Sequence, residues 1–182
     1  VIGNNATLRY TGNTTNSDRG FFIYPGGATL EIASNAANLL LTGDGIRGAG
    51  QNLTKTGPGV LSLLNGTGGA NTYADLNVNN GQVRLSVSSG TGNINLAAGT
   101  TLGLTNNISL ANRVNANDSA AIDNTNTSVL NVVAGTGNLS VTNPGIAMLV
   151  FNATLTNYSG DFTFVGVGTI RFNNATNTSN CR

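Results

Sequence analysis

The sequence contains no histidine or tryptophan, and only one cysteine, one methionine and three prolines among its 182 residues. Charged residues make up 8% of it, against about 25% in an ordinary soluble domain. Without histidine, the Ser-His-Asp and Cys-His catalytic arrangements are excluded. A single cysteine without histidine cannot form a structural zinc site. The net charge of +1, with basic residues scattered along the chain, argues against nucleic acid as a partner.

Long apolar runs are also missing. No stretch approaches the roughly 20 residues that a membrane-spanning helix needs, so we predict no membrane insertion of this segment. No signal peptide is visible at Val1, which fits a mature product or an excised segment. Cys181 has no internal partner, which leaves an intermolecular disulfide and an incidental thiol as alternatives. The low-lysine composition, rich in Asn, Thr and Gly, favours a secreted, extracellular or cell-surface protein.

Apolar residues do recur, in short triplets with a polar or small residue in the middle. This alternation is typical of a β-strand with one face buried. The middle residue of four triplets is charged, and a charge between two buried neighbours points outward. The triplets are Leu8-Arg9-Tyr10, Leu30-Glu31-Ile32, Leu61-Ser62-Leu63, Val83-Arg84-Leu85, Leu102-Gly103-Leu104, Leu130-Asn131-Val132 and Ile170-Arg171-Phe172.

A unit of about 86 residues occurs twice in the sequence. Residues 52–60 match 138–146, and Gly81-Gln82-Val83-Arg84-Leu85 matches Gly168-Thr169-Ile170-Arg171-Phe172. Motifs that recur in the same order are the mark of a solenoid, in which each repeat stacks on the last. The organisation predicted is one domain over 1–182, with copies at approximately 26–88 and 98–172 and a polar tail at 173–182.

We therefore predict an all-β fold, a right-handed parallel β-helix of about nine coils. Gly and Asn, both poor helix formers, interrupt every candidate helical window. A β-sandwich would also contain regular short strands, but it does not require one motif to recur in order. The polar stretch Arg113–Thr127 is the main insertion between the copies, and we expect it to bulge as a loop.

Lys55-Thr56-Gly57-Pro58-Gly59-Val60-Leu61-Ser62-Leu63, followed by Asn71-Thr72-Tyr73 and Gly81–Leu85, resembles the autotransporter-associated β-strand repeat. The pattern of that family is K-T-G-x-G-T-L-x-L, N-x-Y-x-G and G-x-L-x-V. The family builds passenger domains of bacterial autotransporter-type surface proteins. The resemblance covers about half of the chain. For function it implies surface display and no particular activity, because the family includes adhesins, fibres and enzyme carriers.

The sequence departs from the family pattern in both copies. The first copy lacks the Gly expected after Tyr73, whereas the second has it at Gly160. The second copy carries Val141 in place of Lys55 and Asn143 in place of Gly57.

Catalysis is not expected. Hydrolytic β-helices need paired carboxylates several Å apart, and only Asp118 and Asp123 lie close in sequence. Asp75 and Asp161 occupy equivalent repeat positions, which fits a turn role. No calcium loop or zinc pattern occurs, so we predict no enzyme activity, no metal and no cofactor.

Asn-x-Ser/Thr sequons are frequent, and two pairs coincide between the copies: Asn52 with Asn138, and Asn65 with Asn152. One interpretation is glycosylation of a rod. The alternative is that Asn fills coil corners and stacks in ladders while Thr follows as a strand former.

Three functions remain open. A structural fibre would assemble head to tail through terminal rungs, because polar caps are not evident at either end. An adhesive passenger segment would bind a host or matrix ligand through Arg113–Thr127 or Phe21-Phe22-Ile23-Tyr24. A polysaccharide-degrading enzyme fits least well.

Overall fold

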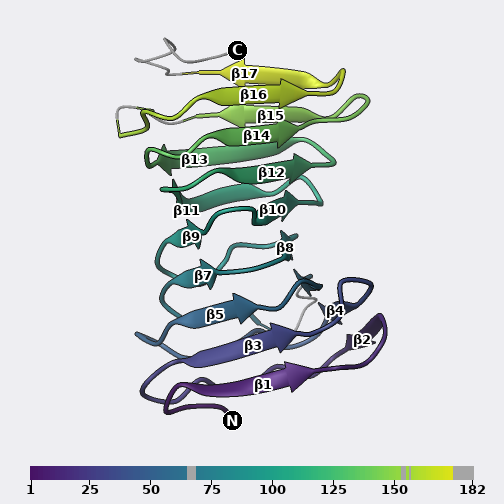
Figure 1. Ribbon diagram of the computed structural model, residues 1–182, viewed down its shortest axis with the longest axis vertical. Helices are drawn as coiled ribbons and strands as arrows, with labels where there is room; N and C mark the ends of the chain where they lie inside the picture. Colours follow the sequence, from purple (N-terminus) through teal and green to yellow (C-terminus); the bar gives the residue numbers. More distant parts are fainter. Residues whose placement is uncertain (65–68, 153–154, 156, 174–182) are drawn as a thin grey trace.

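The computed structural model describes residues 1–64, 69–152, 155 and 157–173. It is all-β, with parallel strands stacked as a solenoid of about eight turns and no helix in the described residues. Figure 1 shows one continuous stack with the two termini at opposite ends. The predicted β-solenoid is therefore confirmed, with about eight turns rather than nine. No helix of the described part is long and apolar enough to cross a membrane.

The first sheet has nine strands in the order β1-β3-β5-β7-β9-β11-β13-β15-β17. Its strands are β1 (Ala6–Tyr10), β3 (Ala28–Ile32), β5 (Leu53–Thr56), β7 (Leu76–Val78), β9 (Ile94–Leu96), β11 (Ser109–Ala116), β13 (Ser128–Ala134), β15 (Met148–Phe151) and β17 (Thr169–Phe172).

The second sheet has eight strands in the order β16-β14-β12-β10-β8-β6-β4-β2. Its strands are β2 (Thr15–Ser17), β4 (Asn38–Leu41), β6 (Val60–Leu63), β8 (Gln82–Leu85), β10 (Thr101–Leu104), β12 (Ala120–Asn124), β14 (Leu139–Thr142) and β16 (Phe162–Val165). Neighbouring strands of both sheets pair in parallel, so each coil lies directly on the one before it.

The alternation in the sequence sets the side that each residue faces. In β3 and β8 the outer members of the triplet are buried, while Glu31 and Arg84 face outward. Stacked inward residues form one apolar core along the stack. Towards the last coils the core becomes aromatic: the Phe151 ring lies 5.3 Å from that of Phe162 and 5.0 Å from that of Phe172.

The segment Arg113–Thr127 is not a bulging loop, so that prediction is wrong. It contains the second half of β11 and all of β12, joined by a short turn. Val114, Ala116, Ala120 and Ile122 are buried. Two of these inward residues are alanines, which made the segment look polar although it keeps the alternation of a strand.

The two copies adopt the same local structure in different sheets. In the first copy β5 pairs with β7 and β6 pairs with β8. In the second copy β14 pairs with β16 and β15 pairs with β17. However, β5 lies in the nine-stranded sheet and β14 in the eight-stranded sheet. The matching strands, β5–β8 and β14–β17, thus form two coils in each copy, and those of the second copy are placed one strand further around the solenoid.

Candidate functional site

The Lys55 ammonium group is buried at the corner between β5 and β6. It donates hydrogen bonds to the carbonyl oxygens of Thr56 (2.8 Å), Gly57 (2.7 Å) and Asn80 (3.0 Å). Asn80 belongs to the next coil, so the lysine links two coils. Burial lowers the pKa of Lys55 from 10.5 to about 8. Its function was missed from the sequence, although its spacing from Leu53 places it on the inward side of the strand.

Asn143 is buried at the equivalent corner of the second copy. Its Nδ2 donates to the carbonyl oxygens of Ala147 (3.0 Å) and Thr169 (2.8 Å), the second of which belongs to the next coil. Its Oδ1 accepts a hydrogen bond from Asn124 Nδ2 at 2.6 Å. An amide therefore makes the inter-coil link that an ammonium group makes in the first copy.

The motif tyrosines are buried and hydrogen bonded in both copies. Tyr73 shares a hydrogen bond of 2.7 Å with Ser89, and burial raises the pKa of Tyr73 above its usual range. The Tyr158 hydroxyl donates to the carbonyl oxygen of Gly137 at 2.7 Å. Both rings belong to the core, so neither is a surface binding residue.

Asn52 and Asn138 make the same hydrogen bond in the two copies. Asn52 Oδ1 accepts from the Asp75 amide at 3.1 Å, and Asn138 Oδ1 accepts from the Asp161 amide at 3.0 Å. Both asparagines are exposed at the surface. The side-chain oxygen of each sequon thus stabilises the next coil, and glycosylation of these residues stays a prediction.

The remaining predicted modification residues differ in their surroundings. Asn152 is exposed and belongs to an asparagine ladder: its Nδ2 donates to Asn131 Oδ1 at 3.4 Å, and Asn173 Nδ2 donates to its Oδ1 at 3.1 Å. Asn65 and Cys181 lie outside the described residues. The expected stacking of asparagine in ladders is therefore observed at Asn152.

Several carboxylates contact neighbouring coils. Asp75 Oδ1 accepts a hydrogen bond from the Asn93 amide of the next coil at 2.7 Å, so this carboxylate links two coils, and its turn role stays a prediction. Glu31 lies 3.4 Å from Arg9 on the neighbouring strand. Within the described part of the chain, no group of three or more acidic or cysteine side chains could hold a metal ion.

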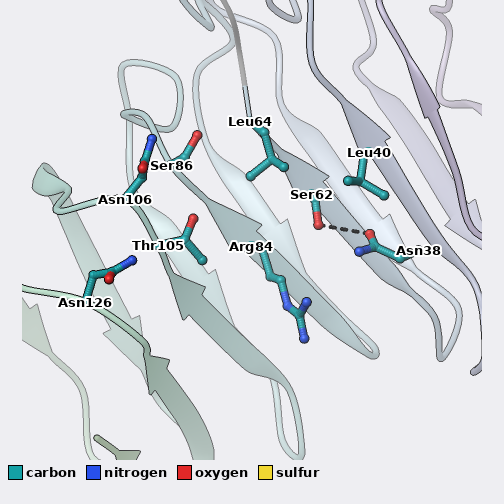
Figure 2. Close-up of a pocket in the computed structure, with 9 residues that line it drawn as sticks. All are labelled: Asn38, Leu40, Ser62, Leu64, Arg84, Ser86, Thr105, Asn106 and Asn126. Carbon is teal, nitrogen blue, oxygen red and sulfur yellow. Dashed lines mark hydrogen bonds between the residues drawn. The ribbon is translucent and has the colours of Figure 1, made fainter. Parts of the chain in front are cut away.

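The eight-stranded sheet carries an open groove on its outer face. The groove has a volume of about 390 Å³ and is lined by residues of β4, β6 and β8 and by residues that follow β6, β8, β10 and β12 (Figure 2). Ser62 Oγ donates to Asn38 Oδ1 at 2.9 Å on one flank. Its lining residues are Asn38, Leu40, Ser62, Leu64, Arg84, Ser86, Thr105, Asn106 and Asn126.

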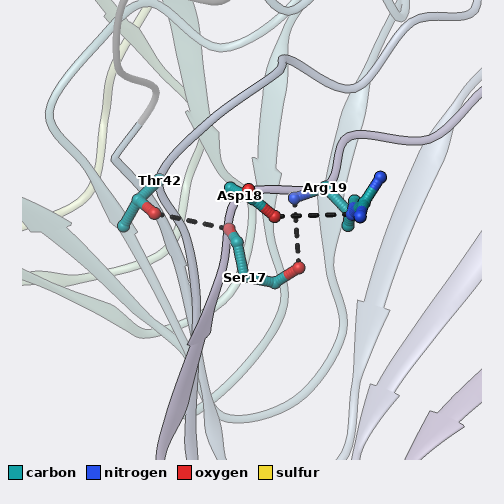
Figure 3. A network of polar contacts seen from close by, with 4 residues as sticks. All are labelled: Ser17, Asp18, Arg19 and Thr42. Carbon is teal, nitrogen blue, oxygen red and sulfur yellow. Dashed lines mark hydrogen bonds and ion pairs between the residues drawn. The ribbon is translucent and has the colours of Figure 1, made fainter.

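Of the strands that the structure describes, β1 and β2 are outermost at one end of the stack, and β16 and β17 at the other. Among the described strands, β1 pairs only with β3 and β17 only with β15. The first coil is held to the second near β2, where Thr42 Oγ1 donates to the Ser17 carbonyl oxygen at 3.4 Å (Figure 3). Arg19 and Asp18 form an exposed ion pair of 3.5 Å beside this contact.

The apolar core is open at the first coil. An apolar hollow of about 230 Å³ lies there, and the half-exposed Leu8 side chain forms part of it. Nearby, Phe22 and Tyr24 are exposed while Ile23 is buried. The Arg47 guanidinium carbon lies 5.6 Å from the centre of the Phe22 ring. The Phe21–Tyr24 segment is therefore partly core and partly surface.

No protein-family model and no solved structure matches the sequence. The chain is 30% identical over 170 residues to a curated relative, the adhesin BmaC autotransporter of Brucella suis biovar 1 (strain 1330). The match covers 91% of this chain and 4% of the relative, so the chain spans a small part of that protein's length. The chain is thus similar to a short stretch of an autotransporter adhesin.

Proposed function

We propose that this chain is a rod segment of a surface-displayed, autotransporter-type adhesin. The observation that carries the proposal is the parallel stack of the described strands, in which β1 and β2 are outermost at one end and β16 and β17 at the other. Such edges accept further coils. The similarity to 4% of a long adhesin supports the same interpretation, because a passenger of that length has room for many such segments.

The surface chemistry supports adhesion rather than catalysis. Outward positions hold amides, hydroxyls and a few charges. The Asp75 carboxylate binds an amide of the next coil, and Glu31 and Asp18 each form an ion pair with an arginine. A rod of this kind presents polar rows at the spacing of the coils, about 4.8 Å apart. Repeated weak contacts along such rows bind a surface through avidity. Location outside the cell is part of this proposal.

The test is adhesion by the purified chain itself. Beads coated with the folded chain should bind to host cells or extracellular matrix, whereas beads coated with the heat-unfolded chain should not. Equal binding by both preparations would overturn the adhesive part of the proposal. Complete absence of binding would do so as well.

A second candidate is assembly of copies end to end. It is favoured by the apolar hollow at the first coil and by the half-buried Phe164 and Phe172 at the last described coils. Stacking the last coil of one copy on the first coil of the next would cover both surfaces, and a head-to-tail contact of this kind propagates into filaments.

Electron microscopy with an edge variant tests this assembly. The Tyr10 carbonyl oxygen accepts from the Ala33 amide, so by alternation the backbone of Thr7 faces the open edge. Filaments that Thr7→Pro abolishes and Thr7→Ala keeps would support assembly. Dispersed short particles at every concentration of the unmodified chain would overturn it.

A further inference from the structure

We propose that the groove on the outer face of the eight-stranded sheet binds a carboxylate-bearing saccharide, with Arg84 as the residue that holds the carboxylate. This inference rests on the proposed adhesive function and names the chemistry of one ligand. It is carried by a cation without an ionic partner that lies beside amide, hydroxyl and aliphatic side chains in one depression.

Arg84 is the charged residue of the groove. The described residues form three ion pairs, and none of them includes Arg84. It also makes no side-chain hydrogen bond among the described residues, although it is only partly exposed. A guanidinium group presents two parallel donors that match a carboxylate.

Gly103 gives Arg84 its position. The two residues are partners in the register between β8 and β10, and Gly103 is buried. A Cβ on Gly103 would lie 2.8 Å from Arg84 Cγ, so the arginine stem lies across the glycine. The next residue in this row is Asp123, and it makes no ion pair with Arg84. The stem of Arg84 therefore lies against the sheet surface, and its guanidinium donors can bind a ligand.

The other lining residues suit a sugar. In Figure 2, Ser86, Thr105 and Asn106 lie on one side of Arg84, and Ser62 and Asn38 lie on the other. Hydroxyl and amide groups both donate and accept, as the hydroxyl groups of a saccharide do. Leu40 and Leu64 add apolar surface for the C–H face of a sugar ring. The volume of about 390 Å³ lies in the range of roughly 300–1,000 Å³ found for small-molecule sites.

The charge pattern favours a carboxylated sugar over a densely sulfated polymer or an acidic peptide. One arginine neutralises one anionic group per site, whereas a densely charged polymer requires clustered cations. The eight basic residues of the chain are scattered, and its net charge is +1. A hexuronate or a sialic acid carries a single carboxylate among several hydroxyl groups, which matches this lining.

Titration of the isotope-labelled chain, followed by NMR, tests the proposal with four probes: trigalacturonate, sialyllactose, neutral maltotriose and a heparin-derived hexasaccharide. We expect a dissociation constant of about 1 mM for at least one carboxylated probe, because the groove is open and the contacts are few. Amide shifts should centre on β6, β8 and β10. Maltotriose should bind at least tenfold more weakly.

The matched variants are Arg84→Gln and Arg171→Gln. Arg171 occupies the equivalent position of the second copy, is exposed and lies outside the groove. Arg84→Gln should weaken binding at least tenfold, whereas Arg171→Gln should leave it within twofold. Gly103→Ala should also weaken binding, because its Cβ displaces Arg84. The amide spectrum of each variant confirms that it is folded.

Several outcomes would overturn the proposal. One is an equal loss of affinity in both arginine variants, and another is tighter binding of the heparin hexasaccharide than of the carboxylated probes. The others are binding of a polyglutamate peptide in place of the sugars, and no amide shift with either carboxylated probe. The bead assay separates this failure from failure of the proposed function. If beads coated with the Arg84→Gln variant still adhere, the adhesive function stands and the groove is not the site of adhesion.

Discussion

The two copies of the repeat build the same corner with different chemistry. In the first copy the turn spans 57–59, and the Lys55 ammonium group fills the space beneath it. In the second copy the turn spans 143–147, is two residues longer, and is held by the Asn143 amide. Both corners contain carbonyl groups that require a buried hydrogen-bond donor. Either donor satisfies this requirement, provided that the turn has the matching length.

The position of the left-handed residue also differs between the corners. In the first corner it is Gly57, with φ of +74°, and in the second it is Gly145, with φ of +62°. A Cβ on Gly57 would lie 2.3 Å from the Ile32 carbonyl oxygen, whereas one on Gly145 would meet nothing within 4 Å. The short corner is therefore packed against the coil below it, and the long corner projects.

The largest expected effect is the loss of stability on substituting Gly57, which should exceed the loss on substituting Gly145. Gly57→Ala should lower the free energy of unfolding by about 4 kcal/mol, because it adds a backbone clash to the strain of a positive φ. Gly145→Ala should cost about 1 kcal/mol, from the positive φ alone. Denaturant unfolding of both variants measures the difference. Equal costs would show that the two corners are packed alike.

Removing the buried donors should have the next largest effect. Lys55→Met and Asn143→Leu should each lower the free energy of unfolding by about 2 kcal/mol, because each leaves buried carbonyl groups without a donor. Val141, the counterpart of Lys55, makes no such contact, and Val141→Ile is the control for a change in core volume. A loss below about 0.5 kcal/mol in either donor variant would contradict the role given to that residue.

The lysine corner should also make stability depend on pH, and the asparagine corner should not. The pKa of Lys55 is lowered from 10.5 to about 8. Between these values the unfolded chain binds more protons at this residue, so the free energy of unfolding rises with pH, by at most about 1.4 kcal/mol per pH unit. The difference between the unmodified chain and Lys55→Met, measured from pH 7 to 10, isolates this contribution. A flat difference would mean that burial does not lower the pKa.

The smallest expected effect concerns the equivalent hydrogen bonds that Asn52 and Asn138 accept in the two copies. Asn52→Ala and Asn138→Ala should each cost about 0.5–1 kcal/mol, since each removes one exposed hydrogen bond to the next coil. Thermal unfolding of both variants measures it. Costs that differ by more than about 1 kcal/mol would show that the copies are not equivalent here. Intact mass of the protein from its native host would reveal whether either asparagine carries a glycan.

Much of the fold could be predicted from the sequence because alternation and repetition are local signals. Glu31 and Arg84 each stand between two apolar residues, and this pattern alone predicts the outward face of their strands. The loop predicted for Arg113–Thr127 is wrong because alanine is a weak apolar signal, and Ala116 and Ala120 are buried in this segment.

The surface was harder to predict, since it depends on neighbours that are distant in sequence. The groove arises because Arg84, Ser62 and Gly103 lie side by side in three coils. The function of Lys55 depends on the Asn80 carbonyl of the next coil. Neither contact between coils is visible within the sequence of one repeat. Comparison of the copies does not reveal them either, because the second copy is displaced by one strand around the stack.

The central claim is that the described strands, from β1 to β17, form one parallel stack, and spin-label distances test it directly. Asn16, Asp123 and Val165 lie in one row of the eight-stranded sheet, in β2, β12 and β16. With Cys181→Ser as background, pairs of labels at Asn16→Cys with Asp123→Cys and at Asn16→Cys with Val165→Cys span five and seven strand intervals. At about 4.8 Å per interval, the stack predicts narrow distributions near ~24 Å and ~34 Å. Equal distances for the two pairs, or a longer pair below about 25 Å, would contradict it.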